Sequence, residues 1–305
     1  MLTFLLVLIV LLVGFFLKRI VVETVSISGY RQKAILITGC DSGFGYDLAM
    51  KCLRNGMAVF ATCLTEEGCE NLRMQSGDVP GHLDSFVMDV RFEGDIAAAL
   101  EHVKRAAALI NKGMGILFCV HGIYGLVNNA GVTCAPLPDD LLTIDDYKRI
   151  VDVNTFGVIR VTHAFKAMIK EQRRELSAFG VSVSAIEPGF FTTPLVNKDR
   201  LKKMLDNGWN KAGEEQRRQY GEEFLAKLKQ CTGMFLERIC SPHTEWVIDA
   251  YFHALTSKFP RARYYVGNDV LFGFLPLSYL PSSVADKLLL IAAHAHGAPK
   301  PCVLS

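Results

Sequence analysis

Short apolar runs alternate with segments of helical periodicity along most of the chain. The run Ala34-Ile35-Leu36-Ile37 is continuously apolar, as in a strand buried on both faces, and residues 46–55 predict the helix after it, with Gly56 at its end. The same alternation continues, with strands predicted over 58–62 and 85–88 and helices predicted from Glu66 and over 93–110. This order predicts an α/β fold, a Rossmann-like doubly wound parallel sheet with helices on both faces.

The middle of the chain carries one long helical pattern. Thr143 is a candidate N-cap, with Asp146 three residues later, and apolar residues recur at helical spacing from there to Ile169. The pattern runs on to Gly180 and leads directly into a strand predicted over 181–186. We therefore expect a single long crossover helix between two strands.

The N-terminus predicts a membrane helix. Residues 2–17 are almost entirely apolar and end at Lys18-Arg19. The run is slightly shorter than the roughly 20 residues that span a bilayer, so a cleaved signal peptide is the alternative. Because the basic pair follows the run and no small-x-small cleavage site precedes it, we predict an uncleaved anchor over 1–19 and a domain over 30–305. Because basic residues beside a membrane helix tend to stay in the cytosol, Lys18-Arg19 favours a cytosolic location of the domain.

The turn after the first strand is rich in glycine. It reads Thr38-Gly39-Cys40-Asp41-Ser42-Gly43-Phe44-Gly45. A strand that leads through such a turn into a helix directs backbone N–H groups and the positive helix end at a pyrophosphate, and glycine allows close approach of the backbone. Alone, the turn is a weak signal for a dinucleotide site.

Three further motifs follow predicted strands. They are Asp89-Val90, Asn128-Asn129-Ala130-Gly131 and the segment from Pro188 to Thr193, which reads Pro-Gly-Phe-Phe-Thr-Thr. With these motifs the chain resembles the classical short-chain dehydrogenase/reductase family over about 33–196. Details such as Cys63-Leu64-Thr65-Glu66-Glu67-Gly68 resemble its membrane-bound retinol and 3α-hydroxysteroid dehydrogenase branch, which implies an endoplasmic reticulum membrane location.

The resemblance implies roles for particular residues. The glycine turn would hold the pyrophosphate, Asp89 with Val90 would contact adenine, and Asn154 would hold a proton-relay water through its carbonyl. The ribose on the nicotinamide side would be contacted by Asn129, Ala130 and Gly131. The nicotinamide carboxamide would be contacted by Pro188, Gly189 and Thr193. A helix cap is the alternative for Asp89, and a structural hydrogen-bonding role is an equal alternative for Asn154.

The cofactor implied is NAD in preference to NADP. Asp41 would repel a 2′-phosphate, and no arginine or lysine occurs in residues 62–65 at the end of the second strand. The acidic residue that usually binds the ribose after that strand is also missing, so the preference rests on Asp41 and on the absence of a basic residue there.

The proton-transfer residues of the family are missing. Oxidation of an alcohol by a nicotinamide needs a proton acceptor, which the family supplies as a tyrosine followed four residues later by lysine, together with a serine. None of the nine tyrosines here has lysine at that spacing. One strand and most of one helix are absent after about residue 170, while residues 113–122 resemble an insertion. The strand over 181–186 could then enter the vacated place in the sheet.

Composition and charge exclude some classes of protein and of site. A formal net charge of +2 without a basic block excludes a typical nucleic-acid binder. The nine cysteines show no metal-ligand spacing, so we expect reduced buried thiols and no metal site. The apolar stretch 270–281 is interpreted as buried core, with a surface that dips into the membrane as the alternative.

The resemblance implies NAD-dependent oxidation of a lipophilic alcohol such as retinol or a hydroxysteroid. A homo-oligomer is compatible with this role.

Three hypotheses remain for the function of this chain. It is an active enzyme with a different acid or base, a noncatalytic NAD-binding membrane protein of the same fold, or a splice variant or faulty gene model that folds poorly. The loss of a whole block beside intact motifs favours the second and third.

Overall fold

Four parallel strands form the main sheet of the computed structural model, which describes residues 23–113, 122–174, 181–295 and 297–299. The strands lie in the order β3-β2-β1-β4. Their bounds are β1 (Ala34–Thr38), β2 (Ala58–Cys63), β3 (His82–Val87) and β4 (Gly125–Val127). The parallel Rossmann-like sheet predicted from the alternation is confirmed.

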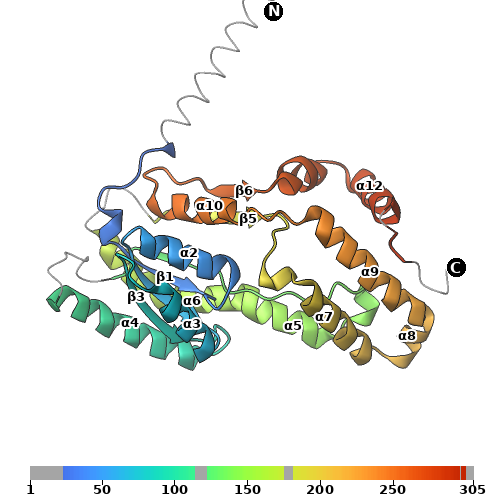
Figure 1. Cartoon of the computed structure of the whole chain (residues 1–305), viewed down its shortest axis with the longest axis horizontal. Helices are drawn as coiled ribbons and strands as arrows, with labels where there is room; N and C mark the ends of the chain where they lie inside the picture. Colours follow the sequence, from blue (N-terminus) through green and yellow to red (C-terminus); the bar gives the residue numbers. More distant parts are fainter. Residues whose placement is uncertain (1–22, 114–121, 175–180, 296, 300–305) are drawn as a thin grey trace, which may run out of the picture.

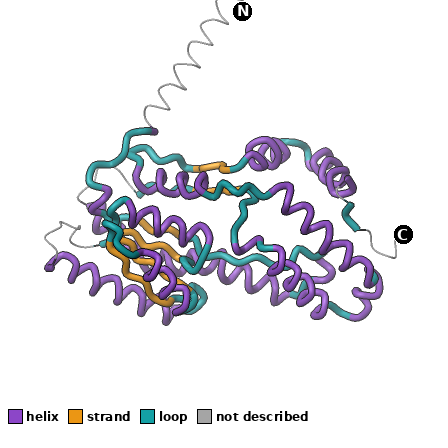
Figure 2. The backbone as a smooth tube through the Cα atoms, in the orientation of Figure 1, coloured by secondary structure: helices purple, strands orange, loops and turns teal. Residues whose placement is uncertain are grey.

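Helices cover both faces of this sheet (Figures 1 and 2). Successive residues of a strand point to opposite faces, so Ile35 and Leu36 of β1 enter different cores. The first core includes side chains of α2 (Gly43–Arg54), α3 (Glu66–Ser76) and α10 (Glu245–Thr256). The second includes side chains of α4 (Glu93–Gly113) and α6 (Val158–Arg174), among them fully buried Phe165.

The long helical pattern is interrupted by a π-helical turn. Thr143 and Asp146 form the predicted capping box at the start of α5 (Ile144–Val151). The chain then widens into η3 (Asp152–Gly157) before α6 begins. Single π turns inside helices are frequent at functional sites, and this one contains Asn154.

The predicted strand over 181–186 does not join the main sheet, and the prediction that it could enter the vacated place is wrong. The strand is β5 (Ala185–Pro188), and it pairs only with β6 (Arg263–Val266) in a separate two-stranded sheet. Tyr264 and Val266 of β6 pack with Val247 of α10, which fixes β6 away from β4. Within the described part of the chain, β4 is therefore one of the two edge strands of the main sheet, with β3 at the other edge.

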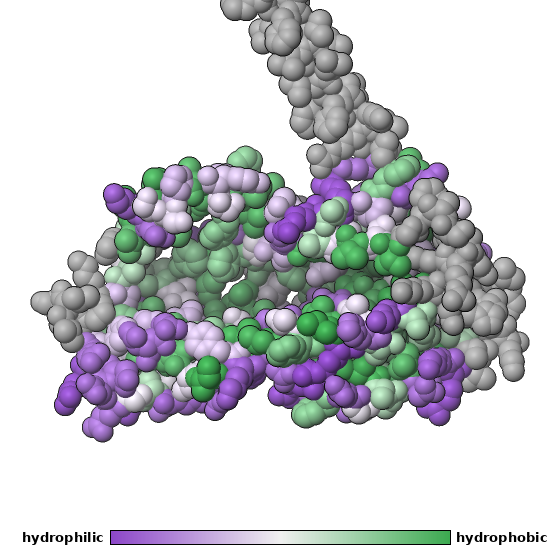
Figure 3. All heavy atoms as spheres, turned by 180° about the vertical axis from the view of Figure 1, so that it is seen from behind, coloured by the Kyte–Doolittle hydropathy of each residue, from purple (hydrophilic) through white to green (hydrophobic). Residues whose placement is uncertain are grey.

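A helical layer follows β5. It comprises α7 (Lys198–Lys211), α8 (Glu214–Tyr220) and α9 (Glu222–Ile239), and the short 3-10 turns η2 (Asp139–Leu141) and η4 (Pro194–Val196) contact it. A further 3-10 turn, η1 (Tyr30–Gln32), precedes β1. The core of the helical layer is centred on Leu205 and Trp209, against Leu141 of η2. Seen from behind, a recess with a hydrophobic floor crosses the molecule between the layer of β5 and β6 and the layer of α5 and α6 (Figure 3).

The C-terminal apolar stretch lies on the surface. It forms η5 (Val270–Phe274), α11 (Leu275–Ser278) and α12 (Ser282–Ala295). Phe272 and Tyr279 are each 81% exposed, so the interpretation of 270–281 as buried core is wrong. The reason is topological: β6 pairs on one side only, and the chain leaving it runs outward instead of back across the sheet.

Two predicted features lie outside the described residues. The anchor over 1–19 is one, and most of the apparent insertion over 113–122 is the other. Among the helices that the structure does describe, none combines the length and the apolar character needed to cross a bilayer.

Candidate cofactor site

The glycine turn forms a close-packed cradle between β1 and α2. Gly39 has φ +72°, and a Cβ atom there would lie 2.8 Å from Cα of Ala130. A Cβ atom on Gly45 would overlap the Gly39 carbonyl oxygen and the Asn129 side-chain amide. The first turn of α2 contains no acidic side chain, so its free N–H groups and positive helix end favour an anion at this point.

Thr38 and Asn129 join this cradle to the end of β4. The Thr38 hydroxyl, which is buried, accepts hydrogen bonds from the backbone N–H groups of Asn129 at 3.1 Å and of Ala130 at 3.0 Å. The Asn129 side chain donates in return to the carbonyl oxygens of Thr38 and Gly39, both at 3.0 Å. The predicted ribose segment from Asn129 to Gly131 therefore lies beside the glycine turn. The role of Thr38 was missed, although a threonine that ends a strand before glycine was the available signal.

The segment from Pro188 to Thr193 reaches the same place from the other sheet. Thr193 Cβ and Pro194 Cδ lie 3.8 and 3.7 Å from the position of a Cβ atom on Gly43. The rings of Phe44 and Phe191 contact each other edge to face, with centroids 6.0 Å apart.

The start of that segment is held by Asp269. Gly189 donates its backbone N–H to the Val266 carbonyl oxygen, and a Cβ atom on Gly189 would overlap the Asp269 carboxylate. That carboxylate accepts a hydrogen bond from the N–H of Phe190 at 2.7 Å. The segment after Pro188 is thus fixed over the cradle even though β5 lies outside the main sheet.

Asp41 crosses from the glycine turn to the end of β2. Its carboxylate accepts hydrogen bonds from the backbone N–H groups of Leu64 and Thr65 and from the Thr65 hydroxyl, at 2.8–3.1 Å. In dinucleotide-binding folds an acidic residue at this point faces the adenosine ribose. Asp41 places a carboxylate there from a different element. Ser42 is the exposed N-cap residue of α2 and makes no side-chain cap bond.

Asp89 is engaged by its neighbour. Its carboxylate accepts hydrogen bonds at 3.0 Å from Nε of Arg91 and at 2.9 Å from the backbone N–H of Arg91. These bonds hold the pKa of the Asp89 carboxyl below its usual value. The N–H of Asp89 itself is bound by Asp95. Val90 is buried against Gly157 of η3. A Cβ atom on Gly157 would lie only 2.7 Å from Cγ2 of Val90.

Asn154 closes the far end of the site. Its side chain accepts from the N–H of Val132 and donates to the carbonyl oxygen of Val132, both at 2.9 Å. Its Oδ1 lies 3.6 Å from the position of a Cβ atom on Gly131. The side-chain amide thus fixes the chain after the predicted ribose segment, which agrees with the structural hydrogen-bonding role. The catalytic role of Asn154 stays a prediction.

The thiols around the cradle are packing groups. Cys40, Cys52, Cys63 and Cys69 are buried and free. Burial raises the pKa of the Cys52 thiol to about 12, and it raises the pKa of Cys40 well above the ordinary value. These side chains stay protonated at neutral pH. Among the described residues, no group of three or more side chains forms a metal site.

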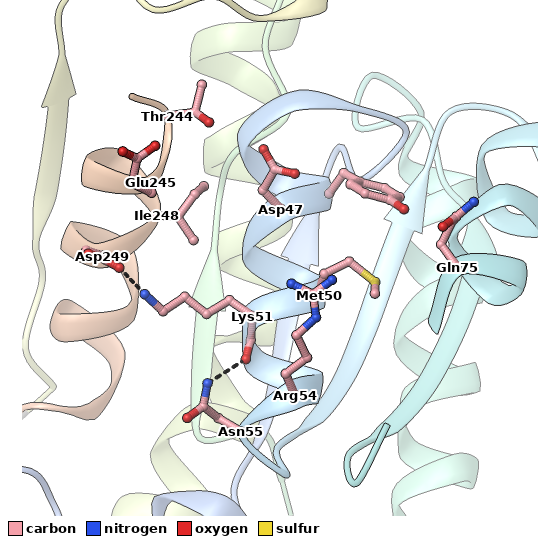
Figure 4. A pocket seen from close by; sticks show the side chains of 11 residues that line it. Asp47, Met50, Lys51, Arg54, Asn55, Gln75, Thr244, Glu245, Ile248 and Asp249 are labelled. Atoms are coloured by element: carbon pink, nitrogen blue, oxygen red, sulfur yellow. Dashed lines mark hydrogen bonds and ion pairs between the residues drawn. The ribbon is translucent and has the colours of Figure 1, made fainter. Parts of the chain in front are cut away.

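A second depression, of about 460 Å³, lies on the outside of α2. Figure 4 shows Lys51 of α2 pointing across it to an ion pair with Asp249 of α10, with Arg54 and Glu245 at its margins. Because both charge signs line it and the ion pair crosses it, this groove offers no anion site comparable to the cradle.

Comparison with known proteins accords with this geometry. A sequence model described as short chain dehydrogenase matches residues 33–174. Retinol dehydrogenase 16 of Homo sapiens is 34% identical, over 86% of this chain and 89% of its own length. The chain belongs to the short-chain dehydrogenase family. Within that family, retinol dehydrogenase 7 of Rattus norvegicus is 35% identical over 90% of the chain, and 17-beta-hydroxysteroid dehydrogenase type 6 of Bos taurus is 34% identical over 92%.

The chain is thus a short-chain dehydrogenase of the retinol and hydroxysteroid branch. Solved structures agree with the fold. A short chain dehydrogenase/reductase from Burkholderia phymatum, determined in complex with NAD, superposes with a TM-score of 0.59 over 82% of this chain and 94% of the other, at 16% identity.

Proposed function

We propose that this short-chain dehydrogenase binds NAD through the glycine cradle and has lost most or all of its catalytic power. The observation that carries the proposal is the assembled cradle. Three separate segments meet at the N-terminus of α2: the glycine turn with Gly39 and Asp41, the segment around Asn129 and the segment around Thr193. When bound, the dinucleotide would accept the hydride. The chain itself binds and orients the dinucleotide.

Asp41 supports NAD over NADP. A carboxylate bound to the N–H groups of Leu64 and Thr65 accepts hydrogen bonds from a ribose hydroxyl and repels a phosphate at the same position. No basic side chain follows β2 in residues 63–65 to offset that repulsion.

The substrate class we propose is a lipophilic alcohol, retinol or a hydroxysteroid. The relatives named retinol dehydrogenase and 17-beta-hydroxysteroid dehydrogenase support this class. The recess with a hydrophobic floor, visible in Figure 3, is suited to such a molecule.

The loss of catalysis rests on the missing proton acceptor. A tyrosine that takes a proton near neutral pH needs a lowered pKa, which a neighbouring cation provides. The pKa is instead raised in five tyrosines, by burial or by a neighbouring aspartate: Tyr46, Tyr147, Tyr220, Tyr251 and Tyr264. For Tyr220, which donates to Asp140, the pKa rises to about 12.

Two features of the comparisons support the proposal that a block is missing. The family match ends at residue 174, close to the point at which the resemblance implies the loss. The alignment with the human relative has 300 positions but takes in only 86% of the 305 residues, so several aligned positions of that relative have no counterpart here. Catalytic serine, tyrosine and lysine residues would belong to such a block.

An exposed apolar surface on α5–η3–α6 is what a missing covering unit would leave. Its exposed members are Ile144, Tyr147, Val151, Phe156 and Ile159. Apolar surface left in water forgoes about 25 cal/mol per Å² of stabilisation. We therefore propose reduced stability and a tendency to self-associate.

We further propose that residues 1–19 anchor the protein in the endoplasmic reticulum membrane with the domain in the cytosol. The apolar run and the basic pair Lys18-Arg19 after it support this topology. Protease digestion of sealed microsomes tests it. Degradation of the domain is expected, and full protection would contradict the proposed orientation.

Binding is tested with NADH and two glycine variants. Gly45→Ala inserts a Cβ atom into the cradle, whereas the control Gly94→Ala at the start of α4 meets no atom within 4 Å. Fluorescence titration should show saturable NADH binding to the wild type and to Gly94→Ala, and weakening of at least about tenfold for Gly45→Ala. Equal affinity in all three proteins would contradict the proposed site.

A further inference from the structure

We propose that η5, α11 and α12 form a second membrane contact, which lies in the lipid headgroup region independently of the N-terminal anchor. The surface, called the C-terminal apolar surface below, consists of residues 270–295. Its exposed apolar members are Leu271, Phe272, Phe274, Tyr279, Leu280, Val284, Leu288, Leu289, Leu290 and Ile291. This inference goes beyond the proposed NAD site and does not depend on it.

The helix α12 is apolar on most of its circumference and yet exposed. Val284, Leu288 and Ile291 follow one another at spacings of four and three residues, so they share one face. Leu289 and Leu290 extend the apolar surface around the helix, and they are 48% and 58% exposed. An apolar helix surface of this width is normally buried in a protein core or in lipid.

The length of α12 decides between spanning the membrane and lying on it. Its 14 residues extend about 21 Å at 1.5 Å per residue, less than the roughly 30 Å hydrocarbon core. Asp286 lies opposite the face of Val284, and Lys287, the next residue, lies at the edge of that face. A helix of this length with a confined charged face lies parallel to the bilayer surface.

Two aromatic side chains suit the same position. Phe272 of η5 and Tyr279 after α11 are each 81% exposed. Aromatic rings with one polar end concentrate at the boundary between lipid and water, as the Tyr279 ring and hydroxyl would.

The route of the chain favours lipid over a second protein copy. The described structure begins at Glu23, six residues after the end of the apolar N-terminal run. Glu23 forms an ion pair with Arg261, and its carbonyl oxygen contacts His253 Nε2 at 2.9 Å. β6 begins at Arg263 and leads into η5, so the start of the domain and the C-terminal apolar surface belong to the same layer (Figure 1). A membrane that holds the predicted anchor would therefore lie against the layer that carries α12, with the apolar side of the helix toward the lipid.

Photocrosslinking of the full chain in phosphatidylcholine vesicles tests the proposal. Phe272→benzoylphenylalanine and Leu290→benzoylphenylalanine place the probe on the C-terminal apolar surface. Met74→benzoylphenylalanine on α3 is the matched control, because Met74 is 74% exposed and lies on the main domain. We expect lipid adducts at 272 and 290 several-fold above those at 74, as measured by mass spectrometry.

A charged variant separates docking from mere tethering. Leu290→Glu combined with Ile291→Glu should lower the lipid adduct at 272 several-fold while NADH binding stays unchanged. Adducts at 272 and 290 no higher than at 74 would overturn the proposal. Crosslinks from these positions to a second copy of the chain, in place of lipid, would overturn it as well.

Discussion

We predict that the Thr38 hydroxyl stabilises the cofactor site by holding the end of β4 against the glycine turn. Thr38→Val keeps the shape of the side chain but removes the acceptor for the N–H groups of Asn129 and Ala130. An unsatisfied buried donor costs about 1–3 kcal/mol. Because both N–H groups are only partly buried, we expect a combined loss of about 2–3 kcal/mol, and weaker NADH binding as the end of β4 moves away from the glycine turn.

Thr38→Ser is the matched control for this prediction. Serine keeps the acceptor and loses one methyl group, at a cost of about 1 kcal/mol. Urea unfolding of the full chain in detergent, followed by circular dichroism, should rank the wild type above Thr38→Ser and Thr38→Ser above Thr38→Val by at least about 1 kcal/mol. If Thr38→Val were as stable as Thr38→Ser, the hydroxyl would not hold the two segments together.

Three further changes test separate parts of the structure. Asp41→Asn removes the charge at the end of β2 and should shift the ratio of NADPH to NADH affinity by about tenfold toward NADPH in fluorescence titrations; an unchanged ratio would contradict the role of Asp41. Arg91 lowers the pKa of the Asp89 carboxyl, so the pair stabilises the fold fully above the unfolded pKa of about 3.9 and loses this contribution as the pH falls through the lower folded value. The difference in unfolding free energy between the wild type and Arg91→Met should accordingly shrink below about pH 4, and a constant difference would refute the pairing. Phe165→Ala should cost about 3–5 kcal/mol in urea unfolding because Phe165 is fully buried, against less than about 1 kcal/mol for Ile159→Ala, which is 45% exposed; equal losses would contradict the packing.

The local signals in the sequence predicted the first half of the fold well. The continuous apolar run at Ala34 became β1, and Thr143 with Asp146 became a capping box, because each depends on neighbouring residues only. The family resemblance implied that the glycine turn and Asn129 contact the same cofactor, and they do lie together, because the carboxyl ends of parallel strands meet at one edge.

The errors concern partners distant in the sequence. The pairing of β5 with β6 depends on contacts with residues near Tyr264, which periodicity near residue 181 does not reveal. The exposure of Phe272 depends equally on the direction in which the chain leaves β6, because an apolar stretch looks the same in a core and on a lipid-facing surface. One omission was local instead: Arg91 was missed as the partner of Asp89 because a neighbouring basic residue is common on any surface.

The central claim is a working dinucleotide site without proton transfer, and a single cuvette experiment tests it most directly. NADH is titrated into the wild-type chain until its fluorescence enhancement saturates, and a saturated 3-ketosteroid is then added, which does not absorb where NADH emits. We predict saturable enhancement, absent in Gly45→Ala, and a constant NADH signal after the ketone is added, because protonation of the product oxygen lacks a donor. A steady loss of NADH fluorescence in the wild type but not in Gly45→Ala, or no enhancement in the wild type at all, would contradict the account.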